Sequence, residues 1–176
     1  QVGDVLVNDE AFSPRRNIVP ELIEQGTDPL ACMVTFCRDN GLEIIWSMRM
    51  NDTHDNSHSP SRPHYYFPSF KRDHPEYLLG SLGKRPMLGS WNAVNYAREE
   101  VRDFAFRVFE EIATRYDVDG IELDFYRHLI FVRSVALGGE ANDEEREMMT
   151  GLVRRTRTML DRVGKDRGKP LLLTVR

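Results

Sequence analysis

The feature that most constrains the fold is the segment at residues 116–128, which reads YDVDGIELDFYRH. Within it Glu122 and Asp124 alternate with apolar residues, and the side chains of a strand point alternately to its two faces. The two carboxylates therefore share one face, while the apolar residues pack against another layer. Burying carboxylates is costly unless cations or hydrogen bonds compensate. The segment predicts a buried strand whose acidic face serves chemistry or binding.

Apolar periodicity predicts that helices and strands alternate along the chain. Asp28 before Pro29 marks one helix start, and Asn142 with Glu145 three residues later forms a capping-box pattern at another. The predicted elements are a helix at 29–41, a strand at 42–50 buried on both faces, a helix at 95–115, the acidic strand, a helix from 142 that ends at Gly164, and a strand at 171–176. Residues 4–7 offer one further candidate strand. The region 51–90 is rich in Pro, His, Ser and aromatic residues, and it predicts a long ordered excursion with a short helical turn near 74–79.

Repeated βα units imply an α/β fold with a parallel sheet, either an open doubly wound sheet or part of a (β/α)8 barrel. Polar residues gather toward the carboxyl ends of all three predicted strands, and in a barrel these faces converge on one mouth. There Arg49 and Arg176 could offset Glu122 and Asp124, whereas an open sheet would bury the charges separately. A full barrel takes about 250 residues. We therefore expect residues 1–176 to form a single, incomplete (β/α)8 domain, with the remainder of the barrel from the same longer chain.

Composition excludes several classes of protein. The net charge of −4 comes from 24 basic and 28 acidic residues that are mixed along the chain, which argues against a nucleic-acid-binding surface. No apolar run approaches the roughly 20 residues of a membrane span, so we expect no membrane segment. Cys32 and Cys37 lie five apart on one predicted helix, where their side chains diverge, so we expect no disulfide between them.

Carboxylates at a barrel mouth, beside arginines and aromatic side chains, are the residue types that form glycosidase active sites. We expect Asp124 to participate directly in catalysis, Glu122 to tune it, and a partner carboxylate to come from strands after Arg176. No cofactor is expected, and the expected partner is a carbohydrate substrate. The predicted substrate-binding residues are Arg49, Asn51, Asp52, His54, Trp91, Tyr126, Arg127, His128 and Arg176.

A resemblance sharpens this reading. The run DVDGIELDFYR, preceded by REEVRDFAFRVFEEIATRY, resembles a strand region of uncharacterised glycosyl-hydrolase-like TIM-barrel proteins of the glycosyl-hydrolase-10-like group, in which a helix reading roughly PEVRD leads into a DG-I-x-L-D strand. The segment WSMRMNDTHD similarly resembles an earlier strand and loop of that group. The resemblance implies a TIM-barrel fold and glycosidase-type activity.

A second resemblance fails at one position. Family-18 chitinases carry DG-x-D-x-D-x-E on such a strand, and Glu122 and Asp124 match the first two acidic positions after the glycine. The position of the catalytic glutamate is occupied by Tyr126. A chitinase-type mechanism would therefore lack its acid.

Two alternatives to a glycosidase remain open from the sequence. One is a carbohydrate-binding barrel without catalysis. The other is a metal-dependent hydrolase, because the loop NDTHDNSHS places His54 and His58 beside Asp52 and Asp55. The segment lacks the HxH and HExxH spacings, so no metal ligand is predicted.

Overall fold

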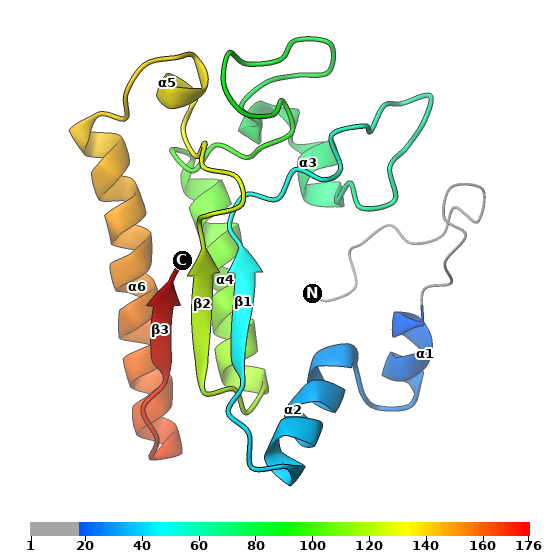
Figure 1. Ribbon diagram of the computed structural model, residues 1–176, viewed down its shortest axis with the longest axis vertical. Helices are drawn as coiled ribbons and strands as arrows, with labels where there is room; N and C mark the ends of the chain where they lie inside the picture. Colours follow the sequence, from blue (N-terminus) through cyan, green and yellow to red (C-terminus); the bar gives the residue numbers. More distant parts are fainter. Residues whose placement is uncertain (1–17) are drawn as a thin grey trace.

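The computed structural model describes residues 18–176, and its core is a parallel sheet with helices packed against it (Figure 1). Strand β1 (Ile45–Arg49) pairs with β2 (Gly120–Asp124), which pairs with β3 (Leu172–Val175). Helix α4 (Glu99–Arg115) connects β1 to β2, and α6 (Asp143–Arg167) connects β2 to β3. The other described elements are α1 (Val19–Glu24), α2 (Pro29–Asp39), α3 (Ser69–Asp73), a 3-10 helix (Pro75–Tyr77) and α5 (Arg133–Ala136). The predicted alternation of helices and parallel strands is confirmed.

Local capping explains where the longer helices begin and end. Asp28 accepts hydrogen bonds from the backbone N–H groups of the first turn of α2, and Asn142 and Glu145 form the predicted capping box of α6. The prediction that this last helix ends at Gly164 is wrong. Gly164 is buried within α6, and the helix continues to Gly168, whose φ of 68° is the left-handed conformation that glycine adopts easily.

The two faces of the sheet differ sharply in burial. Ile121 and Leu123 are buried against the helices, and Trp46 meets Phe109 of α4 edge to face with ring centroids 6.5 Å apart. The opposite face presents Ile45, which is 41% exposed, together with the polar side chains of the predicted mouth. The prediction that β1 is buried on both faces is therefore wrong for the described residues. In a closed barrel this second face lines the interior.

A buried carboxylate, Asp119, ties the amino-terminal ends of the strands together. It accepts hydrogen bonds from the backbone N–H of Ile44 at 2.7 Å and from Arg38 at 2.9 Å, and Lys169 pairs with its other oxygen. Burial raises the pKa of the carboxyl, but the bonds from Arg38, Lys169 and Ile44 outweigh burial and hold the pKa well below its usual range. The site joins α2, β2 and the segment before β3.

We expect Asp119→Asn to destabilise the protein by about 2–4 kcal/mol at pH 7, because it leaves two cations without their shared carboxylate. A carboxyl whose pKa is lowered by folding stabilises the protein above its unfolded pKa of about 3.9 and loses that effect as pH falls toward the folded pKa. Urea unfolding should therefore show a smaller difference between wild type and variant at about pH 3 than at pH 7. An equal difference at both pH values would contradict this assignment.

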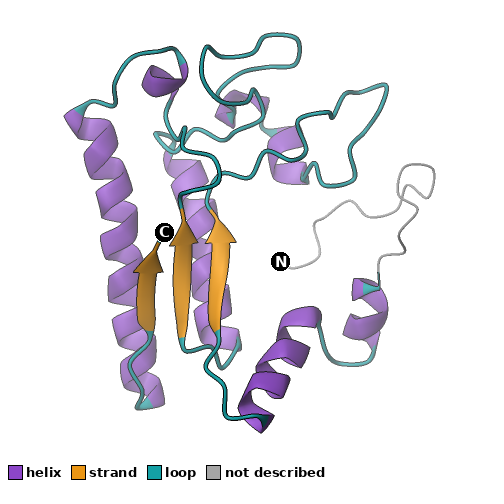
Figure 2. Cartoon of the chain, viewed as in Figure 1, coloured by secondary structure: helices purple, strands orange, loops and turns teal. Residues whose placement is uncertain are grey.

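The excursion after β1 is ordered, and it lies at the carboxyl ends of the strands with the other long connection (Figures 1 and 2). Its helical part begins earlier than predicted, with α3 followed at once by the 3-10 helix. Cys32 and Cys37 are free thiols, as predicted. The candidate strand at residues 4–7 lies outside the described residues. Among the described helices, none has the length and apolar character that crossing a membrane requires.

Candidate active site

Glu122 and Asp124 point to the open face of the sheet, in register with residues of β1. Asp124 pairs with Arg49 in the register and Glu122 with Ser47, whose hydroxyl donates a 2.8 Å hydrogen bond to the Glu122 carboxylate. Asp124 is the last residue of β2, and its Oδ1 accepts a 3.0 Å hydrogen bond from the backbone N–H of Tyr126. Asp124 is therefore nearer the mouth, while Glu122 lies one layer deeper, as the sequence predicts.

The expected charge compensation of these acids takes a different form. Arg49 forms its ion pair with Asp52 at 3.2 Å, and the Arg176 guanidinium lies over the Tyr126 ring at 5.9 Å from the centroid. In the part of the chain that the structure describes, neither arginine is ion-paired with Glu122 or Asp124. The offset expected from the two arginines is therefore not made through direct ion pairs with these acids among the described residues. Partial exposure lets water solvate the acids instead.

Two residues predicted to bind substrate are instead parts of the packed interior. Asn51 is 3% exposed. Its amide nitrogen donates to the backbone carbonyls of Val94 and Ile130, and its amide oxygen accepts a hydrogen bond from the Val94 N–H. It thereby joins the connection after β1 to the connection after β2 at the carboxyl end of the sheet. Trp91 is 6% exposed, donates to the carbonyl of Asn56 and packs on Phe67 with ring centroids 5.8 Å apart. Neither residue presents a free polar group or an open ring face.

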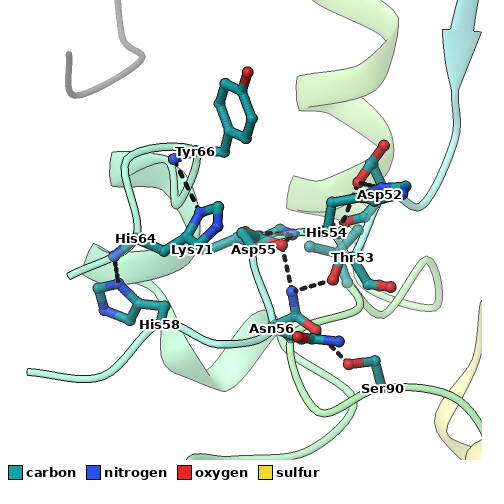
Figure 3. Close-up of polar contacts among 12 residues, drawn as sticks. Asp52, Thr53, His54, Asp55, Asn56, His58, His64, Tyr66, Lys71 and Ser90 are labelled. Atoms are coloured by element: carbon teal, nitrogen blue, oxygen red, sulfur yellow. Dashed lines mark hydrogen bonds and ion pairs between the residues drawn. The ribbon is translucent and has the colours of Figure 1, made fainter. Parts of the chain in front are cut away.

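The loop after β1 holds a carboxylate and an imidazole side by side (Figure 3). Asp52 Oδ1 accepts from the backbone N–H of His54 at 2.8 Å and from its ring Nδ1 at 2.7 Å, and Arg49 approaches the other oxygen. Burial raises the pKa of Asp52, but these hydrogen bonds outweigh it and bring the pKa to about 2. Asp52 is therefore ionised at neutral pH, and His54 is held with its ring against it.

The connection after β2 brings the other predicted residues to the same mouth. His128 lies beside the Thr53 hydroxyl, with Nδ1 3.2 Å from it, and its ring is 5.6 Å from that of His54. Burial lowers the pKa of His128, although the Asp52 charge opposes this shift. Tyr126 is 69% exposed, and together with Arg127 and His128 it lines a cavity of about 400 Å³. These residues, predicted from their position after the strand, do lie together.

A larger cavity of about 570 Å³ is lined in part by β1 and by the loop after it. Its polar wall includes Arg49, Asp52 and His54, and its aromatic wall includes Tyr66, which is largely exposed. Polar groups and an aromatic face in one concavity are the usual make-up of a site for a small organic ligand. Arg49, Asp52 and His54 therefore border a space that a ligand could enter.

The sequence interpretation missed the buried charges that support this loop. Lys71 donates to both oxygens of Asp55, at 3.0 and 3.1 Å, and to the carbonyl of Asp52 at 2.9 Å (Figure 3). Asn92 also donates to Asp55. Burial lowers the pKa of Lys71, and Asp55 opposes that shift. Lys71 lies in a short helix 16 residues after its partner, and no periodic pattern marks such a pair.

The parallel strands, their covering helices and the polar mouth at their carboxyl ends define part of a (β/α)8 barrel. Two solved structures share this architecture. The galactosidase domain of the alpha-galactosidase-sucrose kinase AgaSK matches with a TM-score of 0.52 and 16% identity, over 85% of this chain and 18% of its own. Alpha-L-fucosidase isoenzyme 2 from Paenibacillus thiaminolyticus matches with a TM-score of 0.53 and 14% identity, over 84% of this chain and 23% of its own. The chain thus spans about a fifth of the length of each.

The family follows from the sequence match. The model of the family described as glycosyl hydrolase-like 10 matches residues 3–146, so the chain belongs to that family. This confirms the resemblance that the motifs around β1 and β2 indicate. A comparison with curated proteins finds no significant match.

Proposed function

We propose that this chain supplies part of the active site of a glycoside hydrolase that acts on a poly- or oligosaccharide. The observation that carries the proposal is the position of Asp124. It ends a barrel strand on the interior face, at the carboxyl-end mouth where barrel enzymes build their active sites. One of its oxygens is held by the Tyr126 N–H, and the other has no partner among the described residues.

In this proposal Asp124 acts as an acid or base on the glycosidic bond, or as a ligand of a sugar hydroxyl. Glu122, held by Ser47 one layer below, tunes the charge at the mouth. Tyr126 offers an exposed ring for stacking on a sugar, and Arg176 lies over that ring. Retaining and inverting glycosidases both need a pair of carboxyl groups, and the second is proposed to come from another strand of the complete barrel.

The test is turnover by the complete protein on a panel of α- and β-linked oligosaccharides and aryl glycosides. Product sugars are measured by chromatography, and glycan binding is measured by calorimetry. Release of sugar above the rate of a boiled control supports the proposal. Binding without turnover would support the non-catalytic carbohydrate-binding alternative. The absence of both binding and turnover across the panel would contradict a carbohydrate function.

A further inference from the structure

Three metal-ligating side chains from two separate connections meet at the mouth. Asp52 and His54 follow β1, and His128 follows β2, 76 residues after Asp52 in the sequence. Each offers one ligand atom, and these atoms all lie within 4.8 Å of one another. We propose that the three residues bind a single divalent transition-metal ion of the Zn²⁺ class. This site is separate from the acid and base chemistry proposed for Asp124.

The ligand chemistry selects the class of metal. Two imidazole nitrogens and one carboxylate oxygen suit zinc and related transition metals, whereas calcium and magnesium prefer oxygen ligands throughout. Bonds from zinc to such ligands measure about 2.0–2.2 Å, so atoms around one ion lie roughly 3–4 Å apart. The ligand atoms lie within 4.8 Å of one another here, and Asp52 and His54 are hydrogen-bonded at 2.7 Å, so side-chain rotations are required to reach that geometry. Three protein ligands leave a coordination position open for water or a substrate oxygen.

Neighbouring residues contact the three proposed ligands and orient them, as outer-shell residues do in known metal sites. The Thr53 hydroxyl contacts His128, Arg49 holds the second oxygen of Asp52, and the Lys71 ammonium donates to the Asp52 carbonyl. Arg49 also brings a positive charge toward the proposed cation. Its side chain is 52% exposed, so solvent screens that repulsion.

The remaining histidine and acid of this loop are committed elsewhere. Asp55 is buried in its pair with Lys71. His58 stacks on Phe67 with ring centroids 3.8 Å apart, and its Nδ1 accepts the backbone N–H of His64. The folded chain therefore selects Asp52 and His54 from the cluster in the sequence and adds His128, which is remote in sequence.

The test is a calorimetric titration of the complete, tag-free protein with ZnCl₂ after chelator treatment and dialysis. A Cys32→Ser, Cys37→Ser background removes binding by these two free thiols. We expect one ion per chain with a Kd of about 1 μM or tighter, and we expect His54→Gln and His128→Gln each to raise the Kd at least about 10-fold. His74→Gln is a matched control, because His74 pairs with Glu76 two residues away at 3.1 Å without a second histidine. It should leave the Kd unchanged.

The proposal is overturned if zinc does not bind, or if His54→Gln and His128→Gln bind it as the background protein does. It is also overturned if His74→Gln weakens binding as much as they do. Circular dichroism and thermal unfolding without metal distinguish a folded variant that lacks a metal ligand from a variant that has lost its fold. Asp52→Asn is a third variant, nearly isosteric with the wild-type side chain. No sugar is present in the titration, so its outcome is independent of whether the protein hydrolyses glycans.

Discussion

Replacing Asp124 with asparagine is expected to lower kcat/KM for glycoside hydrolysis by about 10²–10⁴-fold, the range that a positioned acid or base contributes. Asparagine keeps the acceptor that holds the Tyr126 N–H, so the turn after β2 should persist. The substitution removes the negative charge at the mouth and the capacity of this side chain to exchange a proton there. Initial rates of the complete protein on its best substrate measure the effect.

Two further variants make this result specific. Glu122→Gln should cost less and should shift the pH profile of kcat/KM, because Glu122 lies one layer deeper, hydrogen-bonded to Ser47. Asp161→Asn removes an acid on the surface of α6 that pairs with Arg157, and it should leave the rate unchanged. An Asp124→Asn protein that folds and hydrolyses the substrate at the wild-type rate would remove Asp124 from the mechanism.

The acidic strand could be predicted from the sequence because its signal is local. Alternation fixes which side chains share a face, so Glu122 and Asp124 lie, as predicted, on the side opposite Ile121 and Leu123. The helix caps at Asp28 and Asn142 are equally local, and the structure confirms both. Such patterns need no knowledge of the rest of the fold.

The partners of the charged residues were not predictable in this way. Arg49 shares a face with Asp124, yet it pairs with Asp52, which the turn after β1 brings back toward it. The buried pair of Asp55 with Lys71 depends on how the excursion folds back, and so does the burial of Trp91. His128 meets His54 only because β1 and β2 are neighbours in the sheet. Contacts of this kind follow from the tertiary fold rather than from spacing.

The loop that carries Asp52 and His54 depends on a buried ion pair, and Lys71→Met is expected to destabilise the protein by about 3–5 kcal/mol. Lys71 is 9% exposed, and without it the Asp55 carboxylate would remain buried with Asn92 as its main partner. The Asp52 carbonyl would also lose its donor. Urea unfolding at pH 7 measures the loss.

A double-mutant cycle separates the pair from the packing around it. Asp55→Asn combined with Lys71→Met should cost less than the sum of the two single changes, because no unpaired charge is left inside. Arg154→Met, which breaks an exposed pair with Glu147 on α6, is the matched control and should cost no more than about 1 kcal/mol. If Lys71→Met costs no more than that control, the buried pair does not hold the loop. Additive costs in the cycle would mean that Lys71 acts through its contact with the backbone rather than through Asp55.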